Sequence, residues 1–459
     1  MRETQPKERW VIGCFILLSG IILFFNLWGR SLENHGYIRY AEVAREMIRS
    51  GEWVVPHWNG KIFIDKPPLL FWLIAIPSFI YGSVTPFLAR LPSALSAWIG
   101  VVILFLWSKR IYGTTQAGLI SGGILLSSYQ YFFQSRLAKT ELLLCLMVIL
   151  SLYFFYLGYH SGGRKRLLFF CSSFFFMGLG VLTKGPFGLL PFVILSVYLI
   201  KERKWKIWFS KEFIMGYIVL VLTVLPWVFL FINRVGLEQT LTILKENRIL
   251  TRTAPFYIYF VQIWGQFSPW SLFLPFLFIY LWKEGRHVLQ SRHGFFLIWF
   301  ISLLILLTVF KYRASRYLLP ALPPLALMIG GLWKKRLMLF ILLFTLAVST
   351  WYIREIIWVK RDVFYSPGMN LVKELKPFLK EATLFAYHLD VSTLEEINFY
   401  LDPQIPIPVL KGVEYLKKPE KGMILMPKEF YDEKMKESYS FTFLKEFHYK
   451  KGMLVLISR

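Results

Sequence analysis

The sequence has few cysteines and few acidic residues, and both shortages narrow the possible classes of protein. Only three of its 459 residues are cysteine, and each lies in an apolar run far from the other two. This spacing argues against a disulfide framework or a cysteine-ligated metal and favours buried or lipid-facing thiols. Aspartate and glutamate total 28 against 53 lysines and arginines, a formal net charge of +25. The chain nevertheless has no nucleic-acid-binding motif, so we expect no nucleic acid as a partner.

Apolar residues, in contrast, are abundant. They make up 56% of the chain, with a mean hydropathy of +0.50. Several runs approach the ~20 residues that cross a bilayer, which a soluble domain of this size would not need. The first run, 11–28, follows the polar and basic segment 1–10, is too long for a signal-peptide core and lacks a small-residue cleavage site. It predicts a retained signal anchor, and the whole chain predicts a polytopic membrane protein.

The basic residues alternate with the apolar runs in the way that the positive-inside rule expects. With a cytoplasmic N-terminus, the rule places these basic loops in the cytoplasm: 109–110, 164–166, 201–211, 283–292 and 334–336. The alternation holds if the short apolar stretch 68–81 lies in the interface or re-enters instead of crossing. We predict about 11 transmembrane helices and an external C-terminus. Tryptophans near the ends of the runs are predicted to anchor the chain at the interface: Trp28, Trp107, Trp270 and Trp282.

Two polar segments interrupt the apolar pattern. Residues 30–67 form a large first external loop, in which apolar side chains recur at helical spacing over 40–48. This periodicity predicts an amphipathic helix on the membrane surface. From residue 355 onward the chain is polar with short apolar runs of strand length, which predict a small external α/β domain. The predicted organisation is a mainly α transmembrane module at 1–354 and a C-terminal external domain at 355–459.

Charged residues at the external ends of the apolar runs are the candidate functional residues. Ionisable groups beside a bilayer are costly, so several cations near a few carboxylates predict a site for a phosphate-bearing lipid. The cations would hold the phosphate, and a carboxylate would act as general base toward an acceptor hydroxyl. The alternative is a solvated rim of snorkelling charges. The candidates are Glu33, His35, Arg39, Glu42, Asp65, Lys66, Arg136, Lys139, Glu141, Lys184, Arg248, Arg313 and Arg316.

Several short motifs occur in a fixed order along the chain. They are RYAE at 39–42, GEWVVP at 51–56, DKPPL at 65–69, ARLPSA at 89–94, LTKGP at 182–186, SPWS at 268–271 and SRYLLPALPP at 315–324. With these motifs the chain resembles, over about residues 28–335, the bacterial GT-C glycosyltransferases that include the lipid A aminoarabinose transferase and the protein O-mannosyltransferases. The resemblance implies a GT-C fold in the bacterial inner membrane. It also implies inverting transfer of a sugar from a polyprenyl-phosphate carrier to a glycolipid, another glycan or a protein at the periplasmic face.

The resemblance further implies roles for individual residues. Lys66, before the Pro-Pro pair, is expected to hold the carrier phosphate with help from Arg39. Asp65 is expected to position the loop or a divalent metal, the one cofactor that we consider, and its alternative role is a helix N-cap.

Three further cations are candidates for the same phosphate. Arg313 and Arg316 precede the matched YLLP run and are predicted to bind phosphate. Lys184 is either a phosphate ligand or a snorkelling anchor that caps helix carbonyls.

The chain also departs from the family pattern. The family usually has an acidic residue just before the RYAE segment, where this chain has Gly36 and Tyr37. The nearest upstream acid is Glu33, with His35 beside it, so Glu33 is the candidate to take over the carboxylate role. His35, Glu42 and Asp65 are expected to support the site.

The second family acid, usually aspartate, corresponds to Glu141, which keeps the charge and adds one methylene. A histidine that some relatives carry after a glutamate is replaced here, in Glu246-Asn247, so no metal is expected there.

The preferred interpretation is therefore a glycosyltransferase in which Glu33 or Glu141 is the base or organises the site. Stabilising the departing phosphate should be the larger catalytic contribution. One alternative is a flippase or transporter of lipid-linked sugars, which would predict polar residues at mid-span and repeated halves. Another is an inactive relative that binds the carrier, an alternative suggested by Gly36 and Tyr37.

Overall fold

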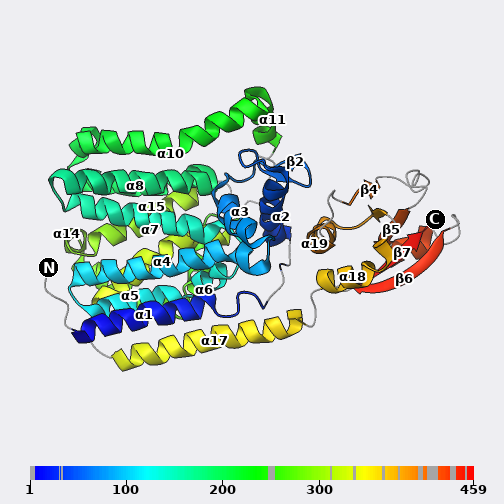
Figure 1. Cartoon of the computed structure of the whole chain (residues 1–459). Helices are drawn as coiled ribbons and strands as arrows, with labels where there is room; N and C mark the ends of the chain where they lie inside the picture. Colours follow the sequence, from blue (N-terminus) through cyan, green and yellow to red (C-terminus); the bar gives the residue numbers. More distant parts are fainter. Residues whose placement is uncertain are drawn as a thin grey trace.

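The protein consists of a bundle of roughly parallel and antiparallel helices, with a smaller segment that contains a β-sheet at one end (Figure 1). The computed structural model describes residues 6–29, 32, 35–246, 254–310, 313–333, 337–363, 367–380, 383–401, 407–410, 422–434, 441–449 and 452–458.

Local sequence signals set the ends of several bundle helices. Helix α4 (Pro86–Tyr112) has proline at its first position, and the Thr85 hydroxyl accepts a hydrogen bond from the Leu88 N–H. It ends at Gly113, whose φ of 75° is the left-handed conformation that glycine adopts without strain. The other bundle helices are α1 (Pro6–Phe24), α5 (Thr115–Ser127), α6 (Tyr129–Ser135), α7 (Thr140–Tyr159), α8 (Gly163–Lys184), α9 (Leu190–Lys201), α10 (Lys211–Val235), α11 (Leu237–Glu246), α12 (Ile258–Gln266), α13 (Leu274–Glu284), α14 (His287–Gln290), α15 (Gly294–Val309), α16 (Leu322–Leu332) and α17 (Leu337–Val363).

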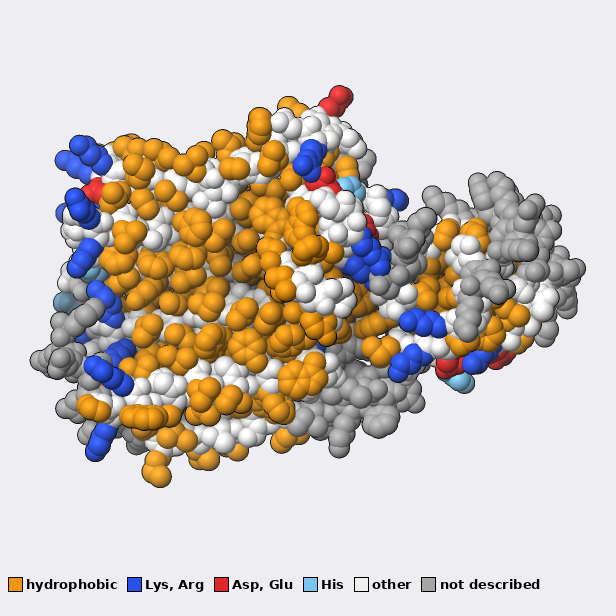
Figure 2. Space-filling view, in the orientation of Figure 1, with side chains coloured by type: hydrophobic (Ala, Val, Ile, Leu, Met, Phe, Trp, Pro, Cys, Tyr) orange, Lys and Arg blue, Asp and Glu red, His pale blue; other side chains and the backbone are white. Residues whose placement is uncertain are grey.

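Five helical stretches of the described chain are long and apolar enough to cross a membrane: α4, α7, the pair α8–α9, α10 and the first part of α17. α7 is buried over most of its length, whereas α10 and α17 are largely exposed and form opposite edges of the bundle (Figure 1). Apolar side chains cover the visible face of the bundle, and Lys and Arg gather at the end where α1 begins (Figures 1 and 2). We call this the basic end, and the opposite one the α2 end.

The structure contradicts the prediction of interfacial anchors for two of the four tryptophans. Trp28 and Trp282 are exposed, as anchors at an interface would be. Trp107 and Trp270 are fully buried, and Trp107 stacks on Trp299 with 5.9 Å between the ring centroids. Nearness to the end of an apolar run does not show which way an indole points, and these two rings fill the core between neighbouring helices.

The predicted amphipathic helix is confirmed as α2 (His35–Ser50), which ends directly before Gly51. Its apolar side, with Ala41, Ala44 and Met47, packs on α3 (Leu69–Tyr81) in one buried cluster. α3 has 13 residues and is therefore about 20 Å long, less than the roughly 30 Å of a bilayer core. This length supports the prediction that residues 68–81 do not cross.

The C-terminal residues form a mixed five-stranded sheet in the order β4-β3-β5-β7-β6. β3 pairs in parallel with β4 and β5, and β7 pairs antiparallel with β5 and β6. The elements of this segment are α18 (Pro367–Leu375), β3 (Thr383–Tyr387), α19 (Val391–Leu401), β4 (Val409–Leu410), β5 (Gly422–Pro427), α20 (Lys428–Lys434), β6 (Thr442–Tyr449) and β7 (Gly452–Ser458).

Helix α19 attaches this segment to α2. The Arg45 guanidinium donates hydrogen bonds to the carbonyl oxygens of Phe399 (2.8 Å) and Asn398 (3.1 Å) at the end of α19. It also lies 5.1 Å from the centroid of the Phe399 ring. The Tyr400 hydroxyl donates to the Leu32 carbonyl, just before α2, at 3.1 Å. The α2 end of the bundle and the C-terminal segment are therefore joined by directed polar contacts.

Candidate functional site

Glu141 lies in the first turn of α7, at the α2 end of the bundle, and is the centre of the site. Its Oε1 accepts a hydrogen bond from Lys184 Nζ (3.2 Å) and pairs with Arg316 Nε at 3.0 Å. The side chains of Glu141 and Lys184 are each only 6% exposed, whereas that of Arg316 is 45% exposed. Glu141 Oε2 is buried without a hydrogen-bond partner among the described residues. One oxygen is thus fixed by two cations, and the other is left to accept a proton or a ligand hydroxyl.

The pairing of Lys184 contradicts one of its two predicted roles. The ammonium bonds to a buried carboxylate and not to helix carbonyls, so the prediction of a snorkelling anchor is wrong. The lysine can be buried because Glu141, on the facing helix, compensates its positive charge.

An aromatic residue that we did not single out as a site residue lies between the two cations. Lys184 Nζ is 4.6 Å from the centroid of the Tyr317 ring, and Arg316 Cζ is 5.7 Å from it. Tyr317 also lines a small pocket with Glu141, Lys184 and Arg316. Cations over an aromatic face are held in place without losing their charge. The SRYLLP motif contains this tyrosine directly after Arg316, and that adjacency was the signal available in the sequence.

Asp65 joins two further cations. Its Oδ1 is 2.9 Å from Lys66 Nζ, and its Oδ2 is 3.9 Å from Arg39 Nη2. The Arg39 guanidinium lies over the Trp58 and Phe63 rings, at 5.6 and 5.2 Å from their centroids. These rings belong to or flank the hairpin of β1 (His57–Trp58) and β2 (Lys61–Ile62). Asp65 therefore orients the two residues predicted to hold phosphate.

The alternative role of Asp65 as a helix N-cap is wrong. The N-cap of α3 is Pro68, three residues further on, and no side chain caps that helix end. The carboxylate is turned to the neighbouring cations instead.

Electrostatic interactions connect the two groups of charges into one site. Burial raises the pKa of Tyr40, which lies within reach of the charges of Glu141, Asp65, Arg39 and Arg316. Burial likewise lowers the pKa of Lys139, and the charges of Arg316 and Arg39 act in the same direction while Glu141 opposes them. The positive charge of Lys66 in turn lies close enough to Lys184 to repel its ammonium group. Five cations and two carboxylates converge here, an excess of positive charge suited to an anion. They are Arg39, Lys66, Lys139, Lys184 and Arg316 with Asp65 and Glu141.

Other predicted residues have different partners. Arg313 donates to the carbonyls of Thr308 (2.8 Å) and Ala254 (2.7 Å), which holds the chain that follows α15. Glu42 pairs with Arg45, on the side of α2 that faces α19. Arg136 is buried and pairs with Glu355 at 3.1 Å.

The structure does not describe several of the predicted site residues or their side chains. Glu33, Asn247 and Arg248 are outside the described residues, and so are the side chains of His35 and Glu246.

The surroundings of Asp65 do not fit a divalent metal. Its described neighbours are the cations Lys66 and Arg39, which would repel a second positive charge. Within the described part of the chain, no three His, Cys, Asp or Glu side chains come together as metal ligands. The reaction proposed below therefore uses no metal at this position.

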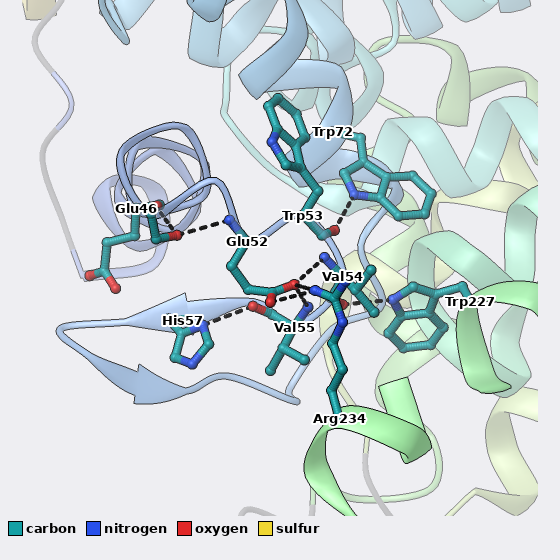
Figure 3. A network of polar contacts seen from close by, with 10 residues as sticks. Glu46, Glu52, Trp53, Val54, Val55, His57, Trp72, Trp227 and Arg234 are labelled. Atoms are coloured by element: carbon teal, nitrogen blue, oxygen red, sulfur yellow. Dashed lines mark hydrogen bonds and ion pairs between the residues drawn. The ribbon is translucent and has the colours of Figure 1, made fainter. Parts of the chain in front are cut away.

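The GEWVVP motif anchors the loop that follows α2 to the bundle (Figure 3). Trp72 Nε1 of α3 donates to the Trp53 carbonyl (2.7 Å), and Trp227 Nε1 of α10 donates to the Val54 carbonyl (2.9 Å). Glu52 accepts hydrogen bonds from its own loop and pairs with Arg234 of α10. Partial burial acts against ionisation, yet these backbone N–H groups and the guanidinium hold the pKa of Glu52 below its usual value. The motif is therefore a structural support for the hairpin beneath Arg39.

This arrangement of helices is the GT-C fold of membrane glycosyltransferases. The structure of ArnT from Cupriavidus metallidurans bound to undecaprenyl phosphate matches with a TM-score of 0.80, 19% identity and 98% of both chains covered. The archaeal oligosaccharyltransferase AglB from Archaeoglobus fulgidus matches with a TM-score of 0.57, 12% identity, and 93% of this chain and 70% of that chain covered. The chain is accordingly an integral membrane protein of mainly helical, GT-C architecture.

Sequence comparison narrows the likeness to one group within that class. Residues 65–229 match the family model of dolichyl-phosphate-mannose-protein mannosyltransferases. The undecaprenyl phosphate-alpha-4-amino-4-deoxy-L-arabinose arabinosyl transferase 2 of Pseudomonas fluorescens is 28% identical, with 72% of this chain and 57% of that protein covered. An uncharacterized protein of Aquifex aeolicus is 30% identical, with 67% and 60% covered. The chain thus spans about three fifths of these relatives, and the predicted resemblance to the aminoarabinose transferase and O-mannosyltransferase group is confirmed.

Proposed function

We propose that this protein is an inverting glycosyltransferase that takes a sugar from a polyprenyl-phosphate carrier. The names of its relatives describe transfer of an arabinose derivative from undecaprenyl phosphate, and the ArnT structure holds undecaprenyl phosphate. The acceptor would be a lipid A-like glycolipid, another glycan or a protein. The observation that carries the proposal is the buried Glu141, held by Lys184 and Arg316 with one free oxygen beside the cations of the loop.

The proposed topology puts the α2 end outside and the basic end in the cytoplasm of a bacterial inner membrane. The gathering of Lys and Arg at the basic end supports this orientation, because such residues mark cytoplasmic loops (Figure 2). We propose about 11 transmembrane helices within a module at 1–354, followed by an external α/β domain at 355–459. The site would then lie where a carrier phosphate meets the outer leaflet.

In the proposed reaction the bond between the anomeric carbon and the carrier phosphate oxygen breaks. The acceptor oxygen forms the new bond from the opposite face of the sugar, which inverts the centre. The carrier phosphate leaves as an anion, and Lys66, Arg39 and Arg316 neutralise the charge that develops on it. Asp65 organises two of these cations through its contacts with Lys66 and Arg39.

Glu141 is proposed to accept the proton of the acceptor hydroxyl through its unpaired Oε2. Lys184 holds this carboxylate in place and, with Arg316, adds to the positive field. Glu33 stays a candidate for the same role. An acceptor that is itself a phosphate would need little help from a base, since it is already ionised.

Other residues are proposed to act indirectly, by positioning the residues of the site. We assign Arg313 to orienting the segment that carries Arg316, because its guanidinium is bonded to backbone carbonyls. Glu42 acts through Arg45 on the position of α2. His35 is kept as a supporting residue on the basis of its place beside Glu33.

The test is transfer from labelled polyprenyl-phosphate sugar by purified protein in detergent or nanodiscs. We expect turnover with the wild type and severe loss in both Lys66→Ala and Glu141→Gln. Activity unchanged in both variants would refute the site. Carrier binding without turnover in the wild type would instead indicate an inactive relative.

A further inference from the structure

A second cavity, lined by polar and apolar side chains, opens at the basic end of the bundle, remote from the Glu141 site. Its volume is about 420 Å³, and its wall includes Tyr112, Tyr280, Arg292, His293, Gly331 and Trp333. On α4, Ser93 bonds to the carbonyl of Lys139 near the first site, and Tyr112 is 19 residues further on. At 1.5 Å per residue the two sites are therefore about 29 Å apart. The cavity is large enough for a small ligand or a lipid headgroup.

Hydrogen-bonding rings form one wall of the cavity in a fixed arrangement. The Tyr112 hydroxyl is 3.0 Å from His293 Nδ1, and the His293 ring lies 5.5 Å from the Tyr112 ring and 5.9 Å from the Tyr280 ring, between centroids. Gly331 makes this possible, because a Cβ there would come within 2.1 Å of the Tyr112 ring. Burial, with a smaller effect of Arg292, lowers the pKa of His293 to about 4. The imidazole is therefore neutral near pH 7, and Arg292 is the charged side chain among the described residues that line the cavity.

Arg292 supplies an incompletely used guanidinium. Its Nη1 donates to the Ile111 carbonyl at 3.1 Å, which fixes the side chain beside the end of α4. Among the residues that the structure describes, no carboxylate lies within ion-pair distance of Arg292. The remaining N–H groups of a guanidinium form a planar fork that matches two phosphate oxygens. The charge of this arginine is thus available to an anion.

The surroundings indicate a lipid as the source of that anion. α13, which supplies Tyr280, exposes Phe276 (70%), Ile279 (50%) and Trp282 (86%) on the outside of the bundle. Such apolar side chains face acyl chains. The cavity is lined by residues that directly follow α14, and α14 lies at the end of the bundle where Lys and Arg collect (Figures 1 and 2). Basic pockets between membrane helices at this level suit anionic headgroups.

We propose that this cavity binds the phosphodiester headgroup of an anionic phospholipid from the leaflet at the basic end. Arg292 holds the phosphate, and the Tyr112, Tyr280 and His293 wall contacts the rest of the headgroup. The site is independent of the proposed transferase reaction, and failure of either leaves the other standing.

The test uses native mass spectrometry of the full chain, titrated with short-chain phosphatidylglycerol, short-chain phosphatidylcholine or inorganic phosphate. We expect phosphatidylglycerol to bind at least about tenfold more tightly than the other two. Arg292→Gln should weaken it about tenfold or more, because the variant loses the charge-assisted hydrogen bonds to the phosphate. Arg286→Gln, an exposed arginine at the same end that does not line the cavity, is the matched control and should bind like the wild type.

Equal weakening in Arg292→Gln and Arg286→Gln, or none in either, would overturn the proposal. So would inorganic phosphate binding as tightly as the lipid, since the ligand would then be a free phosphate. If Arg292→Gln does not fold, Arg292→Lys keeps the charge and loses the fork. That variant should retain a preference for the anionic lipid at a several-fold lower affinity.

Discussion

The two ends of the bundle use lysine and arginine in different ways. At the basic end Lys201 and Lys109 pair with neighbouring glutamates in settings that remain partly open to solvent. At the α2 end Lys184 and Glu141 are almost fully buried, and cations from α2, its loop and the chain before α16 meet in one place. Exposed pairs cost little and contribute little, whereas buried ones persist only with closely matched partners. A functional site therefore differs from the basic residues that only orient the chain in a membrane, because its charged side chains are buried and converge on one place.

The largest expected effect comes from Glu141→Gln. The amide cannot accept the proton and leaves Lys184 and Arg316 without their common counter-charge. We expect kcat for sugar transfer to fall by roughly 10²–10⁴. Glu202→Gln, which alters an ion pair at the basic end, is the matched control and should stay close to wild-type activity. Comparable losses in the two variants would remove the distinction between the ends.

Lys66→Ala should have the next largest effect. Loss of one cation at the departing phosphate is expected to lower kcat/KM about 10²-fold. Lys66→Arg should recover part of this loss, since the charge is retained. The control is Lys109→Ala, which breaks the ion pair with Glu8 at the basic end and should change transfer less than about twofold. A weak effect of Lys66→Ala would indicate that the remaining cations suffice.

Arg45→Lys tests whether the C-terminal segment positions the site. Lysine keeps the charge but cannot bond two carbonyls of α19 and Glu42 in one plane. We expect KM for the carrier sugar to rise about fivefold with a smaller change in kcat, because α2 also carries Arg39. Arg49→Lys, on the same helix, serves as the control. A change in thermal stability alone, with unaltered KM, would limit Arg45 to a structural role.

The smallest effect concerns pH and stability. Burial raises the pKa of Glu395 in α19 to about 8 from an ordinary value of 4.5. The unfolded chain releases this proton above about pH 4.5 and the folded chain holds it until about pH 8, so the free energy of unfolding falls as pH rises through this window. Glu395→Gln should flatten that dependence, measured by thermal unfolding between pH 5 and 8. An unchanged slope would assign the dependence to other groups.

Sequence patterns predicted the elements with strong local signals. The spacing of Ala41, Ala44 and Met47 was enough to predict α2, because amphipathic periodicity is a property of one segment. The resemblance to the family likewise pointed to Lys66 and Glu141, which the fold brings to the same end.

Contacts between distant segments were beyond local patterns. The burial of Lys184 depends on Glu141, 43 positions away, and that of Trp107 depends on α15. Arg313 and Arg316 are three residues apart and look equivalent in sequence, yet one bonds backbone carbonyls and the other the site carboxylate. Only the packed structure separates such pairs.

The attachment of the first loop to α10 has a mechanical consequence. α10 is a largely exposed helix at one edge of the bundle, and its Trp227 and Arg234 hold the segment 52–54 that leads into the β1–β2 hairpin. The hairpin in turn supplies Trp58, on which the Arg39 guanidinium rests. A change in bilayer thickness that shifted α10 sideways would therefore also move the hairpin, and with it the Arg39 guanidinium.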